Sequence, residues 1–148
     1  DAIAPTVLYG GANYAFPSGG RKYRPPRSPE RSIWHSLPGV HQSTYYSTSL
    51  LKSIMYDIEY RVCSDYYMAA TIHRLGVRHI CLDAPLSDKE VGGTSYDSPW
   101  KMTIEPFKVQ RKVLKQNVFL CTISAIRRRI SRQALTFYMS PFGRRFLS

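Results

Sequence analysis

A helix-glycine-strand segment near the middle of the chain constrains its fold more than any other stretch. Residues 65–75 have apolar side chains at the spacing of a buried helical stripe. Ser64 at the N-cap position and Gly76 after the last apolar residue predict where this helix begins and ends. Residues 77–82 then predict a strand that ends at residues 83–85, Asp-Ala-Pro. This order is typical of an α/β protein, so we expect a small sheet with helix 65–75 packed on it. The stripe residues are Tyr67 or Met68, Ile72 and Leu75.

Shorter segments on either side complete the predicted body. Residues 6–10 favour a buried strand that stops at the two glycines 10 and 11. Residues 47–54 predict a short helix capped by a hydroxyl side chain. Two surface loops are expected, one rich in proline and arginine at residues 17–29 and a polar one at residues 86–100.

The composition fits one globular domain and excludes several other classes. The chain has 148 residues, of which 43% are hydrophobic, and this is enough to build a core. No run of 18 apolar residues and no basic-then-apolar leader occur, so we expect neither a membrane-spanning helix nor a secretory signal. Neither the histidines nor the three cysteines, Cys63, Cys81 and Cys121, have metal-ligand spacing. The thiols favour a reducing, cytoplasmic setting, and no metal ligand is predicted in this chain.

The positive charge is concentrated at one end of the chain. Residues 1–100 hold ten Lys/Arg and nine Asp/Glu, whereas residues 101–148 hold eleven Lys/Arg and one acid, Glu105. We therefore predict two parts, a nearly neutral domain at 1–104 and a basic tail at 105–148. Such a tail attracts an anionic partner, which a phospholipid surface, a nucleic acid or an acidic protein could provide.

The tail has the pattern of an amphipathic helix over about residues 105–132. Its shared face would carry Val109, Val113, Leu120 and Ile123, with a break or shift near Ser124. Lys and Arg beside apolar residues are typical of a peripheral anchor, so we expect the tail to project from the body and rest on an anionic membrane surface. The lipid headgroups would be contacted by Arg127, Arg128, Arg129 and Arg132, with Arg144 and Arg145 further on. The alternative is a solvated basic helix that packs on another protein surface.

Four small features could carry chemistry, and each also has an ordinary structural explanation. Asp65 in the first turn of helix 65–75 is either a capping acid or a carboxylate held ionised to accept a proton. Gly92, Gly93, Thr94 and Ser95 form either a flexible turn or a loop whose amides approach a phosphate or sugar. His41 and Gln42 after a Pro-Gly turn are either structural or part of a binding site. Tyrosine pairs at 45–46 and 66–67 could stack on sugars or belong to the core.

From Val7 to Leu114 the chain resembles the second half of bacterial family 2 glycosyltransferases of the GT-A type. Five motifs carry the resemblance and occur in the family's order. They are Val-Leu-Tyr-Gly at 7–10, Leu-Pro-Gly-Val-His-Gln at 37–42, the signature around Asp57 and Asp65 at 56–67, His-Arg-Leu-Gly at 73–76, and Gly-Gly-Thr-Ser at 92–95.

The resemblance implies an inverting sugar transferase with a partial GT-A fold, the acceptor-side half, followed by the basic tail. In the family the residue matching Asp65 is the general base, and the one matching Asp57 is structural. His41, Gln42 and the loop 92–95 would contact substrate. The implied partners are a nucleotide-sugar donor and a glycan or lipid-linked acceptor. The implied cofactor is a divalent cation, Mg²⁺ or Mn²⁺, whose ligands lie mostly in the family's first half, which is absent from this sequence.

Two other functions stay open at this point. The high net charge and many tyrosines fit a small basic nucleic-acid-binding protein, although the charge sits in one terminal stretch and no nucleic-acid-binding motif occurs, which disfavours nucleic acid as partner. The third candidate function is that of a non-catalytic interaction module.

Overall fold

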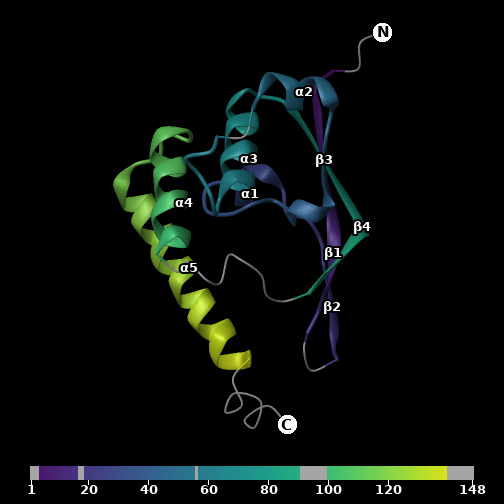
Figure 1. The fold of residues 1–148 in the computed structure, drawn as a ribbon, viewed down its shortest axis with the longest axis vertical. Coiled ribbons are helices and arrows are strands. Elements are labelled where there is room, and N and C mark those ends of the chain that lie inside the picture. Colours follow the sequence, from purple (N-terminus) through teal and green to yellow (C-terminus); the bar gives the residue numbers. More distant parts are fainter. Residues whose placement is uncertain (1–3, 17–18, 56, 91–99, 140–148) are drawn as a thin grey trace.

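The computed structural model describes residues 4–16, 19–55, 57–90 and 100–139 and arranges them in three layers (Figure 1). A sheet forms one side with α2 across its upper end, helix α3 lies in the middle with α1, and α4 and α5 form the other side. The strands are β1 (Thr6–Ala15), β2 (Arg21–Arg24), β3 (Thr44–Tyr46) and β4 (Arg78–Glu90). The helices are α1 (Pro29–Ser32), the 3-10 helix η1 (His41–Ser43), α2 (Thr48–Ser53), α3 (Ser64–Arg74), α4 (Lys101–Lys112) and α5 (Val118–Met139).

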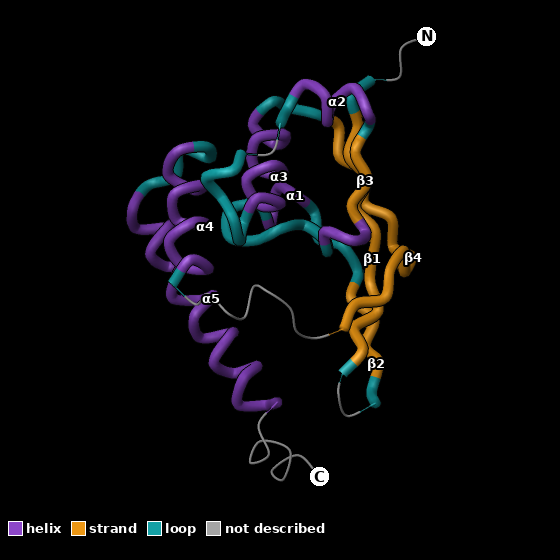
Figure 2. Tube along the Cα trace, viewed as in Figure 1, coloured by secondary structure: helices purple, strands orange, loops and turns teal. Residues whose placement is uncertain are grey.

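The sheet is mixed, with β1 at its centre (Figure 2). β4 runs parallel to β1 along its whole length, while β3 and β2 pair antiparallel with the first and second halves of its other edge. A parallel pair needs a long crossover connection, and here α3 is the helix that leads into β4. The expected α/β class with a small sheet and helices packed on it is therefore confirmed.

Both long strands continue where the sequence predicted that they would end. β1 passes through Gly10 and Gly11, and β4 passes through Pro85 and includes residues 86–90, which were expected to be loop. The register of the pair shifts at Gly10–Ala12, where Gly11 faces Pro85. A proline is tolerated at a bulge or on an edge strand, because no ladder hydrogen bond is needed there. Gly10 leaves the space that the Leu86 side chain occupies, so a side chain at that position would collide with it.

Helix α3 is confirmed to within one residue of its predicted bounds and packs on both of its sides. Met68 and Ile72 face the sheet in a cluster with Val7 and Tyr9. Tyr66 and two alanines face α1 and α4 in a second cluster. Two details of the prediction are wrong, since Cys63 occupies the N-cap position instead of Ser64, and Leu75 is 62% exposed at the end of the helix.

The predicted continuous helix 105–132 is two helices. The chain turns between α4 and α5, where Lys115 has a positive φ of 54° and the Asn117 side chain accepts a hydrogen bond from the Leu120 amide. Asn at a helix start satisfies an amide that has no partner within the helix. The turn removes the shared apolar face, so Val109 is buried but Leu120 and Ile123 are 40% and 39% exposed. The expected break near Ser124 is wrong too, because Ser124 lies inside α5.

The expectation that the C-terminal segment projects away from the body is wrong for α4. This helix begins at Lys101, so the predicted domain boundary at 104/105 falls inside it. Glu105 and Val109 are buried against the body, and α4 packs against both α3 and α5.

The loop expected at residues 17–29 contains an ordered strand, β2, and leads into α1 at Pro29. Helix α2 lies within its predicted range. In the part of the chain that the structure describes, no helix is both long and apolar enough to cross a membrane.

Candidate functional site

His41 and Asp65, which lie 24 positions apart in the sequence, meet in the structure. His41 Nδ1 is 3.1 Å from Asp65 Oδ1. The His41 side chain is 47% exposed and the Asp65 side chain 34% exposed, so a molecule in solution can reach both. At this distance the two groups are in ion-pair contact, to which the histidine contributes a positive charge only when its ring is protonated.

Asp65 is not needed to cap helix α3. The amides of Val62 and Cys63, just before the helix, donate to Glu105 Oε2 at 2.8 and 3.0 Å. Glu105 therefore supplies the negative charge that a helix N-terminus favours. Among the described residues no backbone amide donates to the Asp65 carboxylate, and its partner is His41. The capping interpretation of Asp65 loses its main support.

His41 is held by the short helix η1 and the turn around it. Ser43, which is fully buried, donates from Oγ to the Gly11 carbonyl at 2.9 Å and lies 2.5 Å from Ser87 Oγ. Thr44 Oγ1 donates to the Val40 carbonyl at 2.9 Å. These bonds tie η1 to the bulged part of β1 and β4, so His41 is presented by a fixed backbone.

The pair has the geometry of an oriented general base. A carboxylate with one oxygen engaged by a histidine keeps its second oxygen free to accept a proton from a hydroxyl within hydrogen-bond distance. The histidine would fix the direction of the carboxylate and stabilise its charge.

The other predicted site residues lie beside His41, in the core or outside the described residues. Gln42 is exposed on η1 beside His41, whereas Gly92, Gly93, Thr94 and Ser95 lie outside the described residues. Tyr66 is core, since its hydroxyl donates to the Ile33 carbonyl at 2.6 Å. Tyr67 stacks on Tyr60 with ring centroids 4.8 Å apart.

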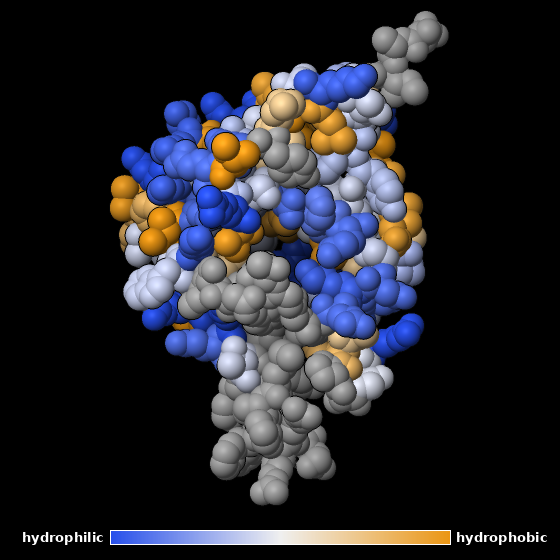
Figure 3. All heavy atoms as spheres, in the orientation of Figure 1, coloured by the Kyte–Doolittle hydropathy of each residue, from blue (hydrophilic) through white to orange (hydrophobic). Residues whose placement is uncertain are grey.

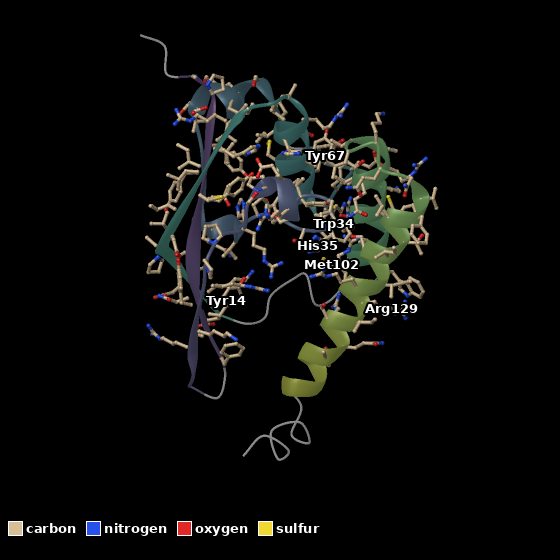
Figure 4. The ribbon with its side chains drawn as sticks, turned by 180° about the vertical axis from the view of Figure 1, so that it is seen from behind. Tyr14, Trp34, His35, Tyr67, Met102 and Arg129 are labelled. Atoms are coloured by element: carbon tan, nitrogen blue, oxygen red, sulfur yellow. The ribbon has the colours of Figure 1, made fainter. Side chains whose placement is uncertain are left out.

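A second feature, which the sequence did not indicate, is a cavity of about 980 Å³ between the sheet and α5. Figure 4 shows its two sides, with Tyr14 on the sheet, Met102 and Arg129 on the helices, and His35 between them. Figure 3 shows hydrophilic side chains gathered over the middle of the sheet. None of the described residues that line the cavity is acidic. Its arginines are Arg24, Arg27, Arg127, Arg128, Arg129 and Arg132.

Arg128 is the most enclosed of these arginines. Its Nη1 donates to the His35 carbonyl and to Ser124 Oγ, both at 2.8 Å. Its Nε and Nη2 are buried and have no hydrogen-bond partner among the described residues. Burial lowers the pKa of the Arg128 guanidinium, which nevertheless stays charged at neutral pH.

The cations also act on His35, which is 8% exposed. Burial first, and then the charges of Arg127, Arg27 and Arg128, lower the pKa of His35 to about 4. The ring is therefore neutral at pH 7, and it senses the positive potential of the cavity.

Two further cations are held in place by aromatic rings. The guanidinium of Arg24 lies 5.7 Å from the centre of the Tyr14 ring, and that of Arg129 lies 5.5 Å from the centre of the Trp100 ring. Stacking of this kind orients a guanidinium while leaving its N–H edge free to bind a ligand.

The residues described here do not fit a divalent cation. No three His, Cys, Asp or Glu side chains converge in the described ranges. Comparisons with protein-family models, with curated proteins and with solved structures find no match for this chain.

The sequence of α5 carries a signal that Arg128 faces inward, although not that a cavity lies beside it. Cys121, Ser124 and Arg128 are spaced three and four residues apart, which places them on one side of a helix. Cys121 and Ser124 are fully buried, so Arg128 must follow them inward. In a run of three arginines on a helix, successive side chains point about 100° apart, and they cannot all face the same surroundings.

Proposed function

We propose that this chain supplies the acceptor-side half of an inverting nucleotide-sugar glycosyltransferase, with Asp65 as the general base. The observation that carries the proposal is the His41–Asp65 contact of 3.1 Å between two exposed side chains. The family resemblance selects the same two residues on independent grounds. The α/β architecture with a parallel β1–β4 pair agrees with a partial GT-A fold, which is part of the proposal.

In the proposed reaction, Asp65 accepts the proton of an acceptor hydroxyl. The hydroxyl oxygen attacks the anomeric carbon of the donor sugar, and the bond from that carbon to the nucleoside diphosphate breaks with inversion. The proton remains on Asp65 until solvent removes it. His41 is a positioning residue, whose N–H holds the carboxylate in the attacking direction. Gln42 and the loop 92–95 are proposed to contact substrate.

The test is sugar transfer by this chain together with the donor-binding half that the family resemblance implies. Asp65→Asn keeps the shape of the side chain but removes the base, and should lower turnover by about 10²–10⁴-fold with donor binding unchanged. His41→Ala removes one hydrogen bond to a charged group, worth about 1.5–3 kcal/mol, and should lower turnover by about 10- to 150-fold.

The matched control is Asp57→Asn. Asp57 Oδ1 accepts from the Glu59 amide at 2.9 Å in a turn before α3, and Asn can make the same bond. This variant should transfer sugar at the normal rate. Normal turnover in Asp65→Asn would show that the base is wrongly assigned, and inactivity of every combination would favour a non-catalytic module.

We also propose that α5 rests on an anionic membrane surface in the cytoplasm. Its outer side exposes an apolar stripe at helical spacing, namely Phe119, Ile123, Ile126 and Ile130, which are 39–72% exposed. Exposed arginines 127 and 129 flank this stripe. Apolar and basic side chains in this arrangement are typical of helices that lie in the membrane interface.

A further inference from the structure

The buried guanidinium of Arg128 needs an anion that the described part of the chain does not give it. A buried charge is costly unless it is paired and its hydrogen-bonding groups are satisfied. Two nitrogens of Arg128 are buried without a partner, and no carboxylate of the described residues lies within ion-pair distance of it. The open space beside Arg128 is the cavity itself.

We propose that this cavity binds the diphosphate group of an organic ligand. Six arginines line it, and the most enclosed of them, Arg128, has two buried nitrogens without a hydrogen-bond partner among the described residues. Each phosphate group carries more than one charge and several acceptor oxygens, so one diphosphate can contact several guanidinium groups. The planar fork of a guanidinium matches phosphate oxygens in pairs, which makes arginine the usual residue for this task.

The arginines approach the ligand from both walls. Arg24 and Arg27 lie on the sheet side, in and just after β2, while Arg127 to Arg132 lie on α5. Tyr14 and Trp100 hold one guanidinium on each wall. Two linked phosphates span such a gap better than a single phosphate, because each can contact a different wall.

Apolar and aromatic side chains line part of the cavity, beside polar ones, and the cavity has room for more than an anion. Tyr14 and Leu37 lie on its sheet and loop side, and Trp100 and Met102 on its helical side. The volume of about 980 Å³ is within the usual range for organic ligands. An aromatic base or an isoprenoid chain would both suit this lining, so the diphosphate is the chemistry that the two sources share.

The inference stands apart from the transfer reaction, because it concerns binding by residues other than His41 and Asp65. Calorimetry of the full chain with inorganic pyrophosphate should show saturable binding, weakened by added salt. Arg128→Met should weaken this binding about tenfold or more, since it removes hydrogen bonds to a charged group. Arg74→Met, at an exposed position at the end of α3, is the matched control and should bind normally.

If Arg128→Met folds poorly, a second variant tests the same proposal through exposed residues. Arg24→Met combined with Arg27→Met changes two exposed side chains of the opposite wall, and the fold should survive it. It should also weaken pyrophosphate binding about tenfold or more. The proposal is overturned if the unchanged protein does not bind pyrophosphate at low salt, or if neither variant differs from Arg74→Met.

Two further titrations distinguish the sources of the diphosphate. Uridine diphosphate binding at least tenfold more tightly than pyrophosphate would assign the cavity to a nucleotide. Geranyl diphosphate binding more tightly by the same factor would assign it to an isoprenoid carrier. Because no turnover is measured, failure of these titrations leaves the assignment of Asp65 intact, and an inactive Asp65→Asn protein should still bind pyrophosphate.

Discussion

The His41–Asp65 pair and the arginine-lined cavity belong to one small fold but are built in opposite ways. The pair is exposed, contains a carboxylate, and joins two short helices on the same half of the chain. The cavity is lined by cations without an acid among the described residues, and it joins the sheet to the C-terminal helices. The pair can act on a proton, whereas the cavity can hold a negative charge.

This contrast shows where the positive charge of the C-terminal region lies in the fold. The basic C-terminal region was expected to face a membrane with its arginines. All three arginines 127–129 border the cavity, where Arg128 is enclosed, whereas Arg127 and Arg129 are also exposed beside the apolar stripe. The outward side of α5 is instead marked by apolar side chains. One helix therefore has two different faces, and the experiments below separate them.

The largest expected effect sharpens this division of α5. Ile126→Ser combined with Ile130→Ser should weaken binding to anionic vesicles by about 100-fold or more, because each isoleucine is worth about 1.5–3 kcal/mol when buried in an apolar surrounding. Both residues are more than half exposed, so the free energy of unfolding should barely change. Co-sedimentation with phosphatidylserine-containing vesicles measures the effect.

The control for this experiment is Met55→Ser with Ile58→Ser, which removes two apolar side chains that are 80% and 92% exposed elsewhere on the surface. It should bind vesicles normally, and pyrophosphate binding should be unchanged in both double variants. Equal binding to neutral vesicles, or no binding at all, would leave α5 without a role at a membrane.

The sequence predicted those elements and site residues whose signal lies within one contiguous segment of the chain. Helix α3 was found because its stripe and Gly76 lie within one segment, and Asp65 and His41 were selected because each lies in a family-like motif. The strand ends were missed because Pro85 is compatible with a strand only at a bulge or an edge, which depends on the pairing with Gly11.

The cavity could not be predicted, because its residues come from three distant segments. Arg24 and Arg27 were assigned to a surface loop, and the arginines of α5 to lipid headgroups or to a basic helix packed on another surface. The turn before Asn117 sets which side of α5 faces the body, and only that orientation shows that Arg128 is enclosed.

A smaller expected effect tests whether the His41–Asp65 pair and the cavity depend on the same buried side chain, Gln110. Gln110 is fully buried, and its Nε2 lies 2.7 Å from the Trp34 carbonyl, 3.2 Å from the Tyr66 hydroxyl and 2.8 Å from Ser124 Oγ. Gln110→Ala should lower the free energy of unfolding by about 2–4 kcal/mol, because it leaves buried polar groups unpaired and a cavity behind.

Urea unfolding measures this loss, with Gln133→Ala on the exposed part of α5 as control. Ser124 also accepts from Arg128, so the surviving folded protein should bind pyrophosphate less tightly while keeping the His41–Asp65 contact. An equal loss of transfer and of binding would contradict the independence of the two sites.

The smallest expected effect is a dependence of stability on pH that arises from His35 alone. Its pKa is about 4 in the folded protein and 6.5 in the unfolded chain, so between these values the unfolded chain binds more protons. The contribution of the neutral ring is complete above pH 6.5 and is lost as pH falls toward 4, by about 2 kcal/mol at pH 5. His35→Gln should reduce the decline seen in urea unfolding by this amount.

Because Arg127, Arg27 and Arg128 cause part of the lowered pKa of His35, pyrophosphate should raise this pKa part of the way toward 6.5, whereas chloride at equal ionic strength should not. Titration of the His35 ring protons by NMR measures both values, and a pKa near 6.5 without ligand would mean that the cavity does not concentrate positive charge around this ring.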